Sequence, residues 1–272
     1  MSSLKCRGRY GMPTLLLLFA TSVLPGCAGS LTQPERSAEQ AVSQQVAVSD
    51  SQQRAKVHTE LGALYLQKGN LAVALEESRV ALNADASYAP ALSLMGLAYM
   101  QLRENASAEK SFEDALRIAP NDPEINNNFG WFLCQTGREQ RSLSYFNMAI
   151  KNPLYSTPAM PNTNAGLCLL RIKDDKGAEA YFMRALRLEP GNARAIYFLA
   201  DIAYRQAHFA AARDYLMDLH KRVEPSAESL WLAVRLERKL GDREAELNSA
   251  LQLNRKFPGS PEQIKLAQGQ FE

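Results

Sequence analysis

A glycine recurs at a nearly constant interval through the middle of this 272-residue chain. Gly62, Gly96 and Gly130 are 34 residues apart, and Gly166 follows after 36. Such a period is typical of chains built from stacked supersecondary units, each of which packs on its neighbours. The repeat therefore constrains the fold more strongly than any single motif.

Small and aromatic residues keep a fixed register after each glycine. The small residues stand twelve and nineteen positions later, and they are Ala74, Ala108, Ser142, Ala178 and Ala81, Ala115, Ala149, Ala185. An aromatic stands sixteen positions after three of the four glycines, at Phe112, Phe146 and Phe182. We expect the small residues where paired helices approach closely, and the aromatics in the gap between one unit and the next. Pro120 and Pro190 end two of the units, because proline cannot continue a helix.

This pattern resembles the tetratricopeptide repeat (TPR), a 34-residue helix–turn–helix. We predict an all-α fold, a right-handed superhelical solenoid of about six tetratricopeptide repeats with a C-terminal capping helix; the alternative is a helical bundle without repeats. The expected units are residues 55–88, 89–122, 123–158, 159–192, 193–226 and 227–260, followed by the cap at 261–272. The third unit is 36 residues long, and we place its two extra residues in a proline-containing loop at 152–158.

The first 26 residues have the pattern of a lipoprotein signal peptide that is removed on export. Lys5, Arg7 and Arg9 precede an apolar stretch at residues 12–24, which is too short to span a bilayer. A weak membrane anchor or a buried helix is the alternative.

The sequence Leu24-Pro25-Gly26-Cys27 resembles the bacterial lipobox. The resemblance implies that Cys27 becomes the mature N-terminus and carries acyl chains that hold the protein on a membrane. Ala28 follows where an aspartate would favour the inner membrane of Gram-negative bacteria, which implies a lipid-anchored protein on the periplasmic face of the outer membrane. We expect residues 27–54 to form the lipidated N-terminus and a flexible tether, or residues 41–48 to form a helix on the domain or on a partner.

No arrangement of residues in the sequence predicts catalysis. His58, His208 and His220 lack a second ligand at metal-binding spacing, and no phosphate-binding loop or nucleophile elbow occurs. The formal charge of +2 includes the cations of the leader, so the remainder is close to neutral and offers no electrostatic footprint for nucleic acid. We therefore expect no enzyme, no cofactor, no metal, no small-molecule substrate and no nucleic-acid partner.

Two cysteines remain once Cys6 leaves with the signal peptide and Cys27 takes the lipid. Cys134 and Cys168 fall in the first helices of the third and fourth units, which are neighbours in a TPR array. Because an exported protein occupies a compartment that permits disulfides, we predict a bond between them. The alternative is a pair of buried thiols.

The first helices of a TPR array line a concave groove, and the repeat register assigns residues to that groove. The expected groove residues are Leu94, Leu97, Met100, Asn127, Asn128, Trp131, Asn164, Leu167, Tyr197 and Phe198, with Tyr204 and Trp231 further along. Asn128 and Asn164 share one repeat position, and their amides could bind an extended peptide backbone while the aromatics act as anchors. The alternative for the aromatics is that they pack between helices.

Three stretches, residues 126–134, 152–155 and 164–168, resemble the PilF/PilW family of type IV pilus biogenesis and stability lipoproteins. Members of that family act as pilotins, which help the pilus secretin to reach the outer membrane and to assemble into its multimeric pore. The resemblance implies that the pilus secretin or another pilus-assembly protein is the partner of the repeat surface. Two alternatives are a TPR lipoprotein scaffold for peptidoglycan enzymes or outer-membrane protein assembly, and an enzyme that uses the repeats as a docking arm.

Overall fold

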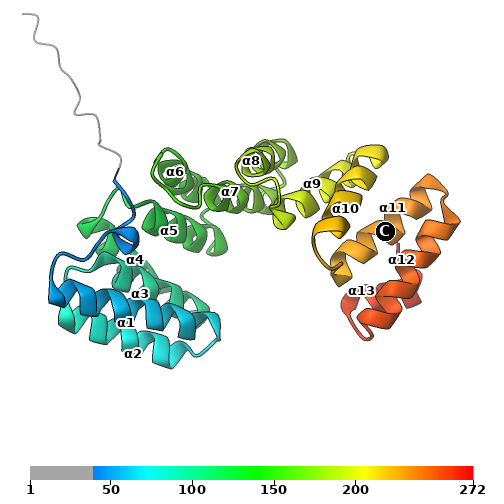
Figure 1. Cartoon of the computed structure of the whole chain (residues 1–272). Helices are drawn as coiled ribbons and strands as arrows, with labels where there is room; N and C mark the ends of the chain where they lie inside the picture. The colour runs from blue at the N-terminus through cyan, green and yellow to red at the C-terminus, as the bar shows by residue number, and fades with distance from the viewer. Residues whose placement is uncertain (1–38, 272) are drawn as a thin grey trace, which may run out of the picture. The chain divides into compact units, whose positions relative to one another are not determined.

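The structure is a computed structural model that describes residues 39–271. Within this range the chain is entirely helical, with thirteen α-helices, one short 3₁₀-helix and no strand (Figure 1). In chain order the elements are η1 (Val42–Gln44), α1 (Asp50–Gln67), α2 (Leu71–Ala84), α3 (Ala89–Gln101), α4 (Asn105–Ile118), α5 (Pro123–Gln135), α6 (Glu139–Ile150), α7 (Ala159–Arg171), α8 (Asp175–Leu188), α9 (Ala193–Arg205), α10 (Phe209–Arg222), α11 (Ala227–Leu240), α12 (Arg243–Lys256) and α13 (Pro261–Ala267).

The first twelve α-helices pack as six consecutive pairs, from α1 with α2 to α11 with α12, and we number these pairs units 1 to 6. Each pair also packs on the next pair, and the first helices α1, α3, α5 and α7 contact one another in turn. The last helix, α13, packs on α11 and α12 as a cap. The all-α repeat fold predicted from the sequence is therefore confirmed.

The recurring glycines let the two helices of one pair approach closely. A Cβ on Gly96 would lie 2.8 Å from the ring of Phe112, and a Cβ on Gly166 would lie 2.6 Å from the ring of Phe182. Both rings are fully buried. The centroid of the Phe112 ring also lies 5.7 Å from that of Phe129 in the next unit, so the same aromatic joins two units. The recurring positions of small and aromatic residues along the chain thus predict both the close contact within a helix pair and the contact between neighbouring units.

The turn inside each unit passes through a residue with left-handed backbone conformation. Three turns use glycine, which adopts this conformation readily, and three use a residue with a side chain. The six residues are Gly69 (φ 77°), Arg103 (62°), Gly137 (78°), Lys173 (61°), Ala207 (59°) and Gly241 (77°).

Residues 39–49 precede the repeats and pack on the array. Ala41 is fully buried, η1 contacts α3, and the side chain of Ser49 caps the start of α1 by accepting from the amide of Gln52. We expected a tether over residues 27–54 or a helix at residues 41–48. Residues 41–45 pack on the domain with one 3₁₀ turn at Val42–Gln44, Val46 and Val48 are exposed, and α1 begins at Asp50. The local reason is that polar side chains of later units bind this segment, as described below.

The expected signal peptide at residues 1–26 and the expected lipidation site at Cys27 lie outside the described residues. Among the helices within residues 39–271, none combines the length and the apolar character needed to cross a membrane.

Candidate partner-binding groove

A cavity of about 400 Å³ lies where α1, α3 and α5 face the loop that ends unit 3. Its volume falls within the range of about 300–1,000 Å³ that is usual for binding pockets. We call this cavity the groove. Its apolar lining includes Tyr88, Leu94, Leu97, Ile125, Tyr155 and Met160, and its polar lining includes Ser43, Lys56, Glu60, Ser93, Glu124 and Asn128.

The apolar part of the groove comes mainly from α3 and α5. Leu94 and Leu97 lie one helical turn apart on α3, and Ile125 on α5 is almost fully buried. Tyr88 and Tyr155 are buried beside them, and this burial, with the nearby carboxylates, raises the pKa of each phenol to about 12. Both phenols are therefore neutral at physiological pH, and this part of the groove suits an apolar side chain.

Asn128 supplies an amide at the edge of this apolar lining. Its Nδ2 donates to Ser93 Oγ at 3.2 Å, and its Oδ1 accepts from Asn127 Nδ2 at 3.4 Å. Because a carbonyl oxygen has two lone pairs, Oδ1 keeps the capacity to accept a hydrogen bond from a ligand. Asn128 therefore lines the groove with an acceptor that a bound peptide backbone could use.

Asn164 has a different role from the one expected. It lies buried on α7 and donates from Nδ2 to Oδ1 of Asn127 on α5, at 3.0 Å. The asparagines thus form a chain of hydrogen bonds that links units 2, 3 and 4 through Ser93, Asn128, Asn127 and Asn164. The repeat register placed these asparagines on the same face of their helices. Their amide groups bond to one another and to Ser93, and of the three asparagines Asn128 alone lines the groove.

Three of the ten expected groove residues, Leu94, Leu97 and Asn128, line the groove. Met100 packs on the aromatic cluster around Phe129, where unit 2 meets unit 3. The remaining residues of units 4 and 5 also pack between helices: Leu167 and Phe198 pack around Phe182.

Tyr197, Tyr204 and Trp231 belong to the later units and lie away from the groove. Tyr197 lines a second cavity of about 340 Å³ near the start of α11, where burial raises the pKa of its phenol to about 12. The guanidinium of Arg235 lies over the rings of Tyr204 and Trp231, at 5.0 and 5.7 Å from their centroids. These aromatics pack against their own neighbours, which is the alternative that the sequence left open.

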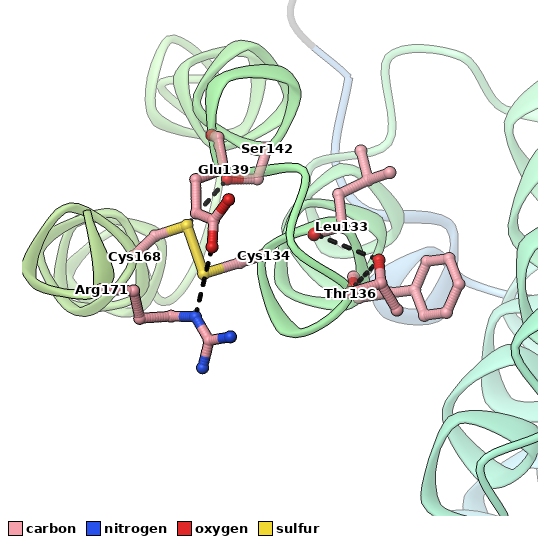
Figure 2. Close-up of a disulfide and its surroundings, with 8 residues drawn as sticks. Leu133, Cys134, Thr136, Glu139, Ser142, Cys168 and Arg171 are labelled. Carbon is pink, nitrogen blue, oxygen red and sulfur yellow. Dashed lines mark hydrogen bonds and ion pairs between the residues drawn. A yellow bond between two sulfur atoms is a disulfide. The ribbon is translucent and has the colours of Figure 1, made fainter.

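Cys134 and Cys168 meet between α5 and α7 (Figure 2). The structure joins their sulfurs in a disulfide, with the Cα atoms 5.8 Å apart and both side chains fully buried. The hydroxyl of Ser142 lies 3.0 Å from Cys168 Sγ, and the half-buried Trp131 packs on the same cluster. Trp131 therefore supports the junction of units 3 and 4 and does not line the groove.

Two acidic residues stand at the start of α5, and one of them, Glu124, lines the groove. Asp122 caps the helix, accepting from Ile125 N at 3.0 Å and from Val42 N at 2.7 Å, and Glu124 accepts from the hydroxyl of Ser43. Burial raises the pKa of both carboxyls above their ordinary values, and for Glu124 the neighbouring Asp122 adds to this effect. Glu124 thus brings a buried carboxyl to the groove.

The repeat register did not identify Ser43, Glu124 and Tyr155 as groove residues. Ser43 precedes the repeats, and Tyr155 lies in the loop at residues 152–158 that contains the two extra residues of unit 3. A 34-residue register therefore gives neither residue a position in the groove. The sequence did show the two extra residues of unit 3 and a possible helix at residues 41–48. Neither feature indicated that these two segments would contact each other.

The histidines are each accounted for by a local contact or by solvent. His58 Nδ1 lies 2.6 Å from a carboxylate oxygen of Glu77, and His220 Nε2 lies 2.9 Å from Ser229 Oγ. His208 is exposed before α10. Within residues 39–271, histidine, cysteine and acidic side chains form no group of three or more that could hold a metal ion.

Comparisons with known proteins agree with this architecture. The tetratricopeptide repeat family matches residues 89–122 and 162–192. The type IV pilus assembly protein PilF of Pseudomonas aeruginosa is 30% identical over 205 residues, which cover 75% of this chain and 81% of that protein. An uncharacterised protein of Haemophilus influenzae is 30% identical over 127 residues, covering 47% of this chain and 71% of that protein.

Two solved structures are similar over most of the array. PilW, described as a widely conserved type IV pilus biogenesis factor, has 32% identity and a TM-score of 0.71, covering 78% of this chain and 98% of PilW. Pseudomonas aeruginosa PilF has 28% identity and a TM-score of 0.73, covering 81% of this chain and all of the PilF chain.

Proposed function

The chain belongs to the PilF/PilW family of TPR proteins in type IV pilus biogenesis, and we propose that it acts there as a pilotin. In this role it binds the pilus secretin and promotes its localisation and multimerisation at the outer membrane. Pilus biogenesis, pilus stability and twitching motility would then depend on it. The relationship to PilF and PilW, which extends over about three quarters of the chain, is the observation that carries the proposal.

The groove provides the physical basis for binding a protein segment. Leu94, Leu97 and Ile125 form an apolar surface beside the amide of Asn128, so one ligand can bury apolar side chains and donate a backbone N–H. Lys56 and Glu60 lie on the opposite helix α1, where they add charge at the rim. An extended segment of the secretin subunit, with apolar residues at intervals, fits this combination best.

Lipid attachment would hold the groove at the membrane where the secretin assembles. We propose that acyl chains on Cys27 anchor the protein on the periplasmic face of the outer membrane, as the lipobox and Ala28 indicate. Radiolabelled palmitate should label the wild-type protein and should not label a Cys27→Ala variant. Labelling that persists in the variant would argue against this anchor.

Capture of the secretin from detergent-solubilised membranes tests the binding proposal. The full-length protein, carrying an affinity tag at its C-terminus, should retain the secretin, and retention should fall for a Leu97→Asp variant of unchanged helicity. Leu61→Asp, on the exposed side of α1, is the matched control. Capture of peptidoglycan enzymes or of outer-membrane assembly proteins in place of the secretin would favour the scaffold alternative.

A further inference from the structure

The segment before the repeats is in contact with the loop inserted at the end of unit 3. Asn152 Nδ2 donates to the carbonyl oxygen of Glu39 at 2.8 Å, although the two residues are 113 positions apart. The side chain of Gln44 donates to Ser156 Oγ, which lies in the same loop. The chain therefore passes beside unit 3 before it reaches α1 of unit 1.

Side chains of the array bind this segment through its backbone. Besides Asn152, the carboxylate of Asp122 accepts from Val42 N, and Lys56 Nζ donates to the carbonyl oxygen of Gln45 at 3.0 Å. These three contacts come from α1, from the start of α5 and from the loop. These side chains thus hold a segment of seven residues against units 1 and 3.

The segment and the loop share one wall of the groove. Ser43 of the segment lines the groove and donates to Glu124, while Tyr155 and Thr157 of the loop line the same cavity. Tyr155 is only 5% exposed, so the loop is packed into place. The two extra residues of unit 3, which the repeat pattern leaves unexplained, thereby acquire a structural role.

We propose that residues 39–45 and the loop 152–158 form a clasp that completes the partner-binding groove, so that partner binding and clasp closure favour each other. In the closed clasp that the structure shows, the groove is an accessible cavity, and Ser43, Tyr155 and Thr157 form part of its lining. A ligand that contacts these lining residues binds more tightly when the clasp is closed than when the clasp is open. This difference in affinity couples ligand binding to clasp closure. The identity of the ligand, though not the clasp itself, rests on the proposed function.

Ser43→Asp opens the clasp from the side of the segment. The variant places a second carboxylate against Glu124, at a site where burial already disfavours negative charge. Ser144→Asp is the matched control, because it makes the same change at an exposed serine on α6. Asn152→Ala opens the clasp from the loop side without adding charge, because it removes the bond to Glu39 together with the bond that Asn152 Oδ1 accepts from Leu154 N inside the loop.

Amide hydrogen exchange on the full-length protein in detergent tests the clasp without any partner. We expect Ser43→Asp and Asn152→Ala each to accelerate exchange both at residues 42–46 and at residues 153–157. Ser144→Asp should leave both segments as in the wild type, and circular dichroism should show equal helicity for all four proteins. Each variant disturbs its own segment directly, so the opposite segment decides: unchanged exchange at residues 153–157 in Ser43→Asp and at residues 42–46 in Asn152→Ala would overturn the clasp.

Secretin capture by the same proteins tests the coupling. Loss of the clasp contacts should reduce retained secretin by about fivefold in Ser43→Asp, on the scale of one or two hydrogen bonds, with Ser144→Asp unaffected. Equal or greater capture by a variant whose clasp has opened would overturn the coupling and would indicate that the segment obstructs the groove. If even the wild type captured no secretin, the proposed function would be contradicted, whereas the exchange measurement would still decide whether the clasp exists.

Discussion

The side-chain amide of Asn164 donates to Oδ1 of Asn127 at 3.0 Å, across the junction between units 3 and 4. Both side chains are buried, and the disulfide of Cys134 and Cys168 joins the same two helices. A covalent bond and a buried hydrogen bond between two amides therefore hold this junction together. The groove lies next to this junction, so the stability of the junction bears on the shape of the binding surface.

Asn164→Ala should weaken the junction of units 3 and 4. The substitution leaves the buried Oδ1 of Asn127 without its donor, which costs about 1–3 kcal/mol of unfolding free energy. Chemical denaturation of the purified protein measures this cost, and Asn105→Ala, at an exposed asparagine that starts α4, is the control. Equal stabilities of the two variants would show that the amide pair does not support the junction.

Reduction of the disulfide should lower the melting temperature and loosen units 3 and 4 before the ends of the array. The bond closes a loop of 34 residues, for which chain entropy predicts a stabilisation of about 3–4 kcal/mol. A Cys134→Ser, Cys168→Ser double variant should melt at the same temperature with and without reductant. Thiol labelling of the denatured, unreduced wild type decides the oxidation state, and two reactive thiols per chain would mean that the cysteines are packed but unbonded.

The carboxyl of Glu124 should make the stability of the array depend on pH in a defined direction. Burial raises its pKa in the folded chain, so the unfolded chain loses this proton first as the pH rises. The favourable contribution is therefore complete below the unfolded pKa and is lost as the pH rises through the folded pKa. Glu124→Gln removes this dependence, so its stability relative to the wild type should increase as the pH rises above the ordinary pKa of a glutamate.

Glu179→Gln is the control for this pH series, because Glu179 is exposed on α8. Urea denaturation at each pH gives the difference in unfolding free energy between variant and wild type. A difference for Glu124→Gln that stays constant with pH, or that changes in the opposite direction, would contradict the buried environment of this carboxyl.

The repeat fold could be predicted from the sequence because side-chain size at fixed positions decides how closely two helices approach. Gly96 lies against Phe112 and Gly166 against Phe182, with no room for a methyl group on either glycine. Such contacts are local, so spacing alone identifies them. The neighbouring positions of Cys134 and Cys168 followed from the same register.

The candidate groove could be predicted only in part, because a register gives the face of a helix but not the partner of a side chain. Asn128 and Asn164 share a position, yet only Asn128 lines the groove, since the amide of Asn164 is used by Asn127. The contact between Asn152 and Glu39 joins two segments outside the repeat pattern, and no local signal pairs them.

Leu97→Asp should reduce secretin capture more than Trp131→Ala does. Leu97 lines the groove and also packs on the aromatic cluster of units 2 and 3, whereas Trp131 packs on the disulfide cluster. A charge inside the apolar lining should cost about tenfold or more in affinity, and truncating Trp131 should act mainly on stability. Binding of the solubilised secretin, measured at equal concentrations of folded protein, separates the two effects. A larger loss from Trp131→Ala would move the binding surface from the groove to the junction of units 3 and 4.

The abundance of SDS-resistant secretin multimers in a deletion strain tests the pilotin role most directly. The deletion should leave the secretin unassembled and abolish surface pili and twitching, and the wild-type gene should restore all three. A copy carrying Leu97→Asp, expressed to the same level, should restore far fewer multimers than one carrying Leu61→Asp. Normal amounts of SDS-resistant multimers in the deletion strain would contradict the pilotin role.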